Sequence, residues 1–155
     1  MKKLVTLLAL TTVFSSQASL QGQLALQGVV TKKLSIEVTA NPVASSLDLV
    51  QSQSNLLVGS VREKSNSNTG YKVKVASSNL GKLVRGGGTE SINYSLKYAG
   101  NAVDLSTVAG QTFNNAGAQV VNTVKDVTIS YTGTPQDSLV EGTYSDTVTF
   151  DISAI

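Results

Sequence analysis

The sequence predicts an all-β fold, an immunoglobulin-like antiparallel β-sandwich, and three observations favour it. Apolar residues repeatedly alternate with polar ones at the two-residue period of a half-buried strand, in a chain rich in Val, Thr, Ser, Asn and Gly. Groups of Asn, Gly and Pro, which form turns, separate these stretches at short intervals. No long stretch has the 3.6-residue period of an amphipathic helix. Short strands with polar outer faces indicate antiparallel sheets rather than a parallel α/β sheet.

The strands are expected in nine places along the chain. In order, they are residues 23–27, 34–39, 47–49, 56–58, 71–76, 92–98, 103–105, 127–131 and 144–152. In the second of these, Leu34, Ile36 and Val38 alternate with polar residues, which is typical of a strand with one buried face. Turns are expected between the strands, for example at Asn41-Pro42 and at residues 68–70, 86–88 and 114–117. No second domain or repeat is visible, so residues 31–155 are predicted to form one sandwich domain.

The first 18 residues are expected to be a secretory signal peptide. Lys2 and Lys3 supply the positive start, residues 4–14 are apolar apart from threonines, and Ser16 and Ala18 place small residues before the cleavage point. The apolar stretch is shorter than the about 20 residues that span a bilayer. A retained membrane anchor is the alternative. Cleavage after Ala18 would leave an exported chain, residues 19–155, without a transmembrane segment.

Composition argues against several classes of function. Without Lys2 and Lys3, the basic residues equal the ten acidic ones, so no charged field favours nucleic acid or gathers cations. His and Cys are both absent, which removes the usual general base, nucleophile and transition-metal ligands. We therefore expect no enzyme: no catalytic residue, no metal site and no cofactor. Without disulfides, an exported domain must rely on strand pairing and burial.

Several segments resemble subunits of chaperone–usher fimbriae. Residues 65–79, SNSNTGYKVKVASSN, are similar to a signature of archaic pilins and spore-coat-U-like domains, and residues 142–152, GTYSDTVTFDI, to their closing strand. Residues 92–100, INYSLKYAG, resemble the middle strand and turn of these families. Residues 34–42, LSIEVTANP, are similar to cysteine-free alpha fimbriae. Many archaic and coat-U-like members carry a disulfide that this chain does not have, which leaves the subfamily open.

The resemblance implies a structural subunit of a fimbria or pilus, exported through the periplasm to the cell surface. In such pilins the sandwich lacks its last strand, so an apolar groove stays open. A periplasmic chaperone fills the groove first, and the N-terminal extension of the next subunit then replaces it at an outer-membrane usher. The implied partners are copies of this chain or related subunits, the chaperone and the usher. The contact is head-to-tail and non-closing, which produces a filament.

Residues 19–30 have the pattern that a donor strand needs. The residues expected to fill the groove share one parity and are Leu20, Leu24, Leu26 and Val30. Gly22 and Gly28 lie between them, where the groove is expected to be shallow. Main-chain hydrogen bonds would supply affinity, and pockets for alternate side chains would set the register. Two alternatives stay open: residues 19–30 form the first strand of a complete sandwich, or residues 22–30 match the first core strand and leave too few residues to donate.

The last strand, residues 144–155, is expected to border the groove and to pair with a chaperone. The side chains predicted to face the core are Tyr144, Val148, Phe150 and Ile152. Asp146 shares their parity, which is unusual for a buried face. It is expected at the rim of the sandwich, after a bulge, or capping a neighbouring loop.

A second function is compatible with the sequence: a self-contained secreted sandwich that binds a surface or a carbohydrate as a monomer. Aromatic residues make up 5% of the chain and Trp is absent, which argues against a sugar-stacking platform without deciding the point. The two functions differ in whether residues 19–30 fill the groove of their own domain or that of a neighbour.

Overall fold

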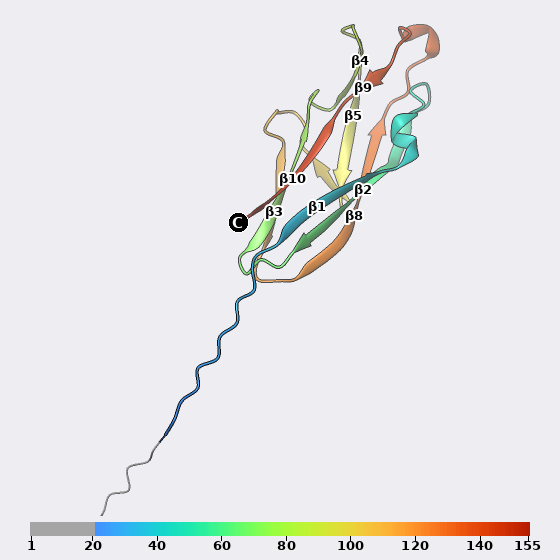
Figure 1. The fold of residues 1–155 in the computed structure, drawn as a ribbon. Coiled ribbons are helices and arrows are strands. Elements are labelled where there is room, and N and C mark those ends of the chain that lie inside the picture. The colour runs from blue at the N-terminus through green and yellow to red at the C-terminus, as the bar shows by residue number, and fades with distance from the viewer. Residues whose placement is uncertain (1–20) are drawn as a thin grey trace, which may run out of the picture. The chain divides into compact units, whose positions relative to one another are not determined.

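The computed structural model describes residues 21–155, so the predicted signal peptide and Leu20 lie outside the described residues. Residues 31–155 form one compact unit built of two antiparallel sheets that pack face to face (Figure 1). This confirms the predicted all-β, immunoglobulin-like sandwich. In residues 21–155, no helix is long and apolar enough to cross a membrane.

The larger sheet has the strand order β1-β2-β8-β5-β4-β9, with β6 paired to β5. Its strands are β1 (Leu34–Ala40), β2 (Gln53–Ser65), β4 (Lys82–Arg85), β5 (Ser91–Tyr98), β6 (Asn101–Val103), β8 (Val121–Tyr131) and β9 (Tyr144–Ser145). The smaller sheet has the order β10-β3-β7, with β3 (Gly70–Ser77), β7 (Gln111–Ala116) and β10 (Val148–Ala154). Two short 3-10 turns, η1 (Pro42–Ser45) and η2 (Gln136–Ser138), lie in the connections.

The hydrophobic core fills the space between the sheets, and each strand contributes alternate residues to it. In β3, Tyr71, Val73 and Val75 are almost completely buried, whereas Lys72 between them is exposed. The buried apolar side chains are Val61, Tyr71, Val73, Val75, Leu83, Ile92, Leu96, Tyr98, Val103, Leu105, Val127, Ile129, Tyr131 and Phe150. The alternation of apolar and polar residues in the sequence therefore corresponds to the alternation of buried and exposed side chains along the strands.

The strand predicted at residues 47–49 is wrong. Leu47 and Leu49 do pack against the core, but they lie in the irregular connection between η1 and β2. Asp48 accepts a hydrogen bond from the backbone N–H of Val50 at 3.0 Å, which bends the chain in an Asx turn and prevents an extended ladder. Tyr131 donates its hydroxyl to the Asp48 carbonyl at 3.0 Å and holds this connection to β8.

The predicted turn at residues 114–117 is only partly correct, because β7 continues to Ala116 and the turn begins at Gly117. The strand is polar, and one large apolar side chain, Phe113, anchors it in the core against Tyr98 with ring centroids 5.5 Å apart. Its backbone pairs with β3 from Gly70 to Val75. The strand β4 also has no counterpart in the sequence-based prediction.

The chain changes sheets between β9 and β10. Tyr144 and Ser145 pair with β4 in the larger sheet, while β10 pairs with β3 in the smaller sheet along its whole length. Asp146 and Thr147 form the crossing point. The C-terminal stretch predicted as one strand is therefore two strands.

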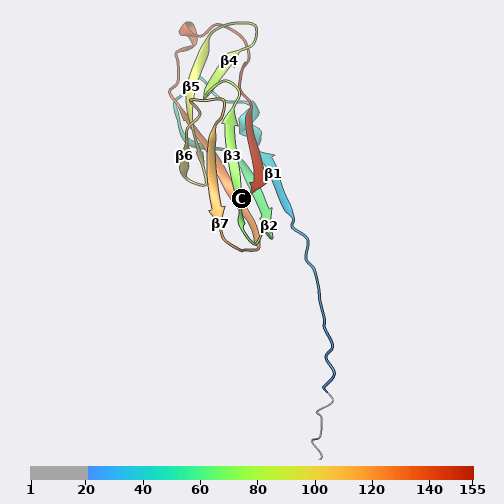
Figure 2. The same cartoon turned by 90° about the vertical axis from the view of Figure 1, so that its left-hand side faces the viewer.

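The strands β1 and β10 are the end strands of their respective sheets, and both lie at the same flank of the sandwich (Figures 1 and 2). Among residues 21–155, β1 pairs only with β2, and β10 pairs only with β3. Every neighbouring pair from β1 to β9 is antiparallel, and β10 continues from β9, so β1 and β10 run in opposite directions. Each presents one row of unpaired backbone groups to this flank.

Candidate functional site

An apolar cavity of about 270 Å³ opens between β1 and β10 and reaches into the core. Its lining residues come from both sheets and from the connection after β1: Val38, Ala40, Ala44, Leu47, Val58, Gly59, Leu83, Tyr94, Leu96, Val127, Ile129, Asp146, Val148 and Phe150. Val38 is 52% exposed although it points to the core side of β1. We name this space the β1–β10 cavity.

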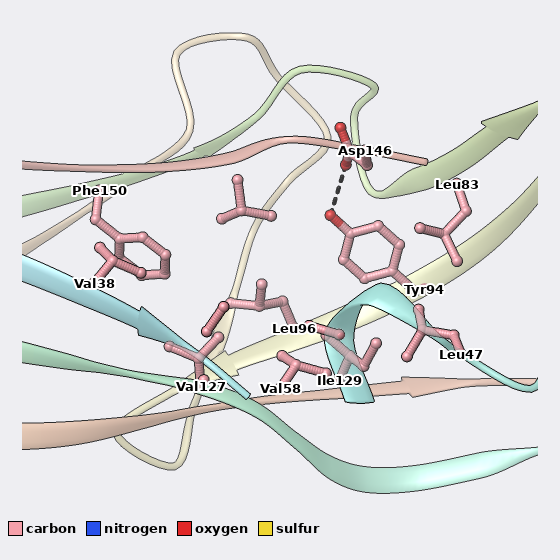
Figure 3. A pocket seen from close by; sticks show the side chains of 14 residues that line it. Val38, Leu47, Val58, Leu83, Tyr94, Leu96, Val127, Ile129, Asp146 and Phe150 are labelled. Atoms are coloured by element: carbon pink, nitrogen blue, oxygen red, sulfur yellow. Dashed lines mark hydrogen bonds between the residues drawn. The ribbon is translucent and has the colours of Figure 1, made fainter. Parts of the chain in front are cut away.

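The floor of the β1–β10 cavity is hydrocarbon. Figure 3 shows Val38 beside Phe150 at one end, with Val58, Leu96, Val127 and Ile129 beneath. Ala40 and Gly59 leave room near the end of β1, because neither has a side chain larger than a methyl group. No titratable group lies among these floor residues. The floor of the cavity therefore suits an apolar side chain.

Asp146 marks the other end of the cavity. Its carboxylate accepts hydrogen bonds from the Tyr94 hydroxyl at 2.6 Å and from the Ser77 hydroxyl at 2.5 Å (Figure 3). It also accepts the backbone N–H of Asn79 at 2.9 Å. Burial, and then the hydrogen bond to Asp146, raise the pKa of Tyr94. Asp146 therefore caps the β3–β4 loop and ties β10 to β5 of the opposite sheet, which agrees with the third of the three positions expected for it.

A buried polar cluster lies between the sheets on the β1 side of the molecule, centred on Glu63 of β2. The Glu63 side chain is completely buried. Its carboxylate accepts hydrogen bonds from the hydroxyls of Tyr71, at 2.6 Å, and Tyr98, and it forms a salt bridge with Lys125 at 2.8 Å. The ammonium group of Lys125 also lies 5.4 Å from the ring centroid of Tyr98. Both carboxylate oxygens of Glu63 therefore have donors, as a buried charge requires.

Burial and the neighbouring carboxylate raise the pKa of both tyrosines in this cluster. For Tyr71 and for Tyr98, loss of solvent around the hydroxyl is the largest cause, followed by the hydrogen bond to Glu63. Both tyrosines therefore remain neutral donors well above neutral pH. The cluster joins β2, β3, β5 and β8 and fixes the two sheets to each other.

The turn between β2 and β3 holds the chain where it enters β1. Asn66 accepts the backbone N–H of Lys33 at 2.6 Å and donates its amide to the Thr31 carbonyl at 2.9 Å. Its own N–H bonds the Lys33 carbonyl at 3.2 Å. These bonds extend the β1–β2 ladder beyond the pair Leu34–Ser65. In the same turn, Gly70 has φ +99°, and a Cβ there would lie 2.3 Å from the Asn115 carbonyl oxygen, so only glycine fits.

The structure places the predicted donor residues outside every strand. Residues 21–33 form no strand or helix, and β1 begins at Leu34. Leu24, Leu26 and Val30 are 83%, 86% and 87% exposed, whereas Leu20 lies outside the described residues. Apart from their neighbours in the chain, no described residue has an atom within 4 Å of where a Cβ on Gly22 or Gly28 would stand. The role of residues 19–30 as a donor strand in another chain stays a prediction.

The predicted groove residues do lie on the core side of the C-terminal strands. Val148 and Phe150 line the β1–β10 cavity, and Phe150 packs against Tyr98 with centroids 5.5 Å apart. Ile152 is partly buried beyond the cavity. Tyr144 packs against the core from β9 and donates its hydroxyl to the Val140 carbonyl.

Sequence reasoning missed Glu63, Asn66 and Lys125. Glu63 shares the parity of Val61 and Ser65, but Val61 is the one apolar residue in residues 61–65, so hydrophobic alternation gave no signal there. A charged residue at an inward position is usually interpreted as a break in a strand, and only the two tyrosine donors explain it. Asn66 lies within the segment that resembles pilins, but nothing in that pattern shows that its side chain binds residues 31 and 33.

Comparison of the chain with protein-family models and with curated proteins gives no match, so the β1–β10 cavity and the strand edges around it are interpreted from the chain's own residues.

Proposed function

We propose that this chain is a structural subunit of a fimbria or pilus and polymerises by donor-strand exchange. One observation carries the proposal: an apolar cavity opens between β1 and β10, which are the end strands of the two sheets. Residues 19–30 of a second copy are the proposed occupant. Export by the signal peptide, and transient occupation of the cavity by a periplasmic chaperone before an outer-membrane usher, belong to the same proposal.

The two strand edges favour a strand as the occupant rather than a small molecule. β1 and β10 each have one paired edge and one edge whose N–H and C=O groups have no ladder partner. A strand between them gains main-chain hydrogen bonds from both neighbours, and its inward side chains enter the cavity. Such an addition would join the two sheets at the flank formed by β1 and β10.

Residues 19–30 suit this role because the described branched apolar side chains of this segment, from Leu24 to Val30, are exposed. Leu24 and Leu26 are each more than four-fifths exposed. Several exposed branched apolar residues in one short stretch usually mark a surface that binds a partner. Burial of one Leu side chain contributes about 2 kcal/mol, so several such residues and the ladder would give a long-lived junction.

The geometry of the two ends supports a filament. The acceptor uses the flank between β1 and β10, whereas the donor precedes β1 by the short link at residues 31–33. The contact is therefore between two different surfaces, so each added subunit leaves one donor and one acceptor free. A heterologous contact of this kind grows into an open chain rather than a closed dimer.

The test is to compare the size of the exported chain, residues 19–155, with two matched variants made without a chaperone. Leu24→Arg places a charge on the groove-facing parity, whereas Val29→Arg places the same charge on the opposite parity. We expect ladders or insoluble polymer from the unchanged chain and from Val29→Arg, and a monomer from Leu24→Arg, measured by size exclusion with light scattering. A stable monomer in all three cases would sink the polymer proposal and leave a self-contained binding module.

A further inference from the structure

We propose that Leu24 and Leu26 of the donor enter the β1–β10 cavity as a pair, that Gly22 and Gly28 lie over its two ends, and that the donor runs antiparallel to β10. This assignment rests on the proposed function, and it defines which residues of one copy meet which residues of the next. It follows from the length of the cavity, from what fills the space beyond each end, and from the position of residues 31–33.

The cavity accommodates two consecutive inward side chains. On β1 its lining residues are Val38 and Ala40, and on β10 they are Val148 and Phe150. Ile36 and Ile152, the next inward positions toward the Glu63 cluster, do not line it. Alternate residues on a strand are about 7 Å apart, so a donor between the two edges has two inward side chains over the open space.

The space beyond the Val38 and Phe150 end is already filled. Ile36 stands opposite Glu63 in the β1–β2 ladder, and Ile152 stands opposite Val73 in the β3–β10 ladder. Glu63 and Val73 are completely buried, and Tyr71 donates to Glu63 beneath them. A donor side chain at this level meets packed atoms, whereas a glycine needs no room.

At the other end, polar groups line the cavity beside Leu47 and Leu83. There the Asp146 carboxylate and the Tyr94 hydroxyl bond each other at 2.6 Å and both line the cavity. A leucine at this level would remove solvent from the carboxylate without giving it a hydrogen bond, which is unfavourable. A glycine brings no side chain to the carboxylate and leaves its existing bonds intact.

Residues 19–30 fit this arrangement in a single register. Its inward parity is Leu20, Gly22, Leu24, Leu26, Gly28 and Val30. At consecutive inward positions it contains one pair of large residues, Leu24 and Leu26. The inward position before this pair and the one after it are glycines, Gly22 and Gly28. The pair fits the open length of the cavity, and the two glycines fit the filled end and the polar end. Leu20 and Val30 then lie outside the cavity.

The position of residues 31–33 gives the direction. Asn66 holds Thr31 and Lys33 of the acceptor at the start of β1, which is the end of the groove nearest the Glu63 cluster. Three residues separate Val30 from β1 of the donor's own domain, so that domain must lie directly beyond the donor's C-terminal end. The acceptor's own residues 31–33 leave its sandwich at the Glu63 end, so we place the donor's domain beyond the Asp146 end. The donor therefore runs with β1 and against β10, with Leu24 opposite Phe150 and Leu26 opposite Val148.

Engineered disulfides test the register, and the absence of Cys from the chain gives a clean background. The assignment brings the outward residues Gln23 of one copy and Asp151 of the next opposite each other. Gln23→Cys with Asp151→Cys in one chain should give covalent ladders on a non-reducing gel, about tenfold more than either control pair, because a disulfide needs Cα atoms within about 7 Å. Gln23→Cys with Thr147→Cys reports the reversed direction, and Ala25→Cys with Asp151→Cys reports a two-residue shift.

Glycine variants give a second readout that needs no cysteine. Gly22→Leu and Gly28→Leu should each slow assembly or speed dissociation about tenfold, whereas Val29→Leu, on the outward parity, should change neither. Ladders from a control pair, or an assembled but uncross-linked chain, would overturn the register while leaving strand donation intact. A chain that stays monomeric with every pair would instead overturn the proposed function itself.

Discussion

At the residue scale, Glu63 is the side chain on which the interior depends most. It is a completely buried carboxylate in a domain with no disulfide, and its donors come from three other strands. The tyrosine hydroxyls and the Lys125 ammonium would all lose their acceptor if it were removed. A buried charge cluster of this kind tolerates partial removal poorly.

We expect Glu63→Ala to lower the free energy of unfolding by about 3 to 5 kcal/mol, because it leaves buried donors without an acceptor and opens a cavity. The measurement is urea denaturation in a Leu24→Arg background, where unfolding is not coupled to assembly. The matched control is Arg62→Ala, the exposed neighbour on the opposite face, with an expected change within about 0.5 kcal/mol. Equal small losses for both variants would show that the cluster contributes little.

The raised pKa values of the buried tyrosines predict that the folded protein loses stability at alkaline pH. An exposed tyrosine has a pKa of about 10, and burial raises the pKa of Tyr71, Tyr94 and Tyr98 in the folded state. At a pH between the tyrosine pKa of the unfolded state and the higher tyrosine pKa of the folded state, the folded protein keeps protons that the unfolded protein releases. The stabilisation is thus fully present below about pH 10 and falls by up to about 1.4 kcal/mol per pH unit for each such tyrosine above it.

This alkaline loss can be measured as the slope of unfolding free energy against pH between about pH 9.5 and 11.5. Tyr94→Phe should give a shallower slope than the unchanged chain, because one buried hydroxyl no longer titrates. All other ionisable groups are the same in both proteins, so the difference between the two slopes reports Tyr94. Identical slopes would contradict a titration of Tyr94 that is coupled to folding.

At the scale of elements, Asp146 stabilises the point where the chain changes sheets between β9 and β10. The chain must leave the larger sheet and join the smaller one within two residues, and backbone groups at such a crossing lose their ladder partners. The Asp146 carboxylate supplies acceptors to the N–H groups of Asn79 and Thr147, at 2.9 and 2.7 Å. One side chain thus fixes the start of β10 and one end of the cavity.

We expect Asp146→Ala to loosen the start of β10 and the β3–β4 loop more than the rest of the sandwich, because each loses hydrogen bonds to the same carboxylate. Hydrogen exchange should become faster at Asn79 and Ser78 and stay unchanged in β8, and urea unfolding should shift by about 1 to 3 kcal/mol. Asp151→Ala, on the exposed face of β10, is the matched control. Uniformly faster exchange over all strands would contradict a local role.

Elements with strong alternation could be predicted from the sequence, and the others could not. β1, β3 and β5 follow the pattern of their apolar residues closely, because each has one buried face. β7 has one large apolar side chain, Phe113, and gains its strand character from pairing with β3, which a single sequence does not reveal. The connection at Leu47 and Leu49 shows the reverse: buried apolar residues at alternate positions without a ladder.

At the scale of the whole molecule, the predicted sandwich is present, and its strand order explains the β1–β10 cavity. The apolar residues that line the cavity were visible as alternation in strands far apart in the sequence. That β1 and β10 would be end strands at one flank depended on topology, which alternation does not encode. The proposed role of residues 19–30 rests on contacts with a second chain, which alternation within one chain does not encode.

The most direct test of donor-strand exchange mixes two variants of residues 19–155 that each have one defect. Leu24→Arg with Leu26→Arg has a defective donor and an intact cavity, and Val38→Arg has an intact donor and a cavity blocked by the half-exposed lining residue of β1. Each variant alone should be a monomer by light scattering. Mixed, they should form a one-to-one dimer and nothing larger, because each pair then has one working donor and one working acceptor. Two monomers that remain separate after mixing, although the unchanged chain polymerises, would contradict donation of residues 19–30 into the β1–β10 cavity.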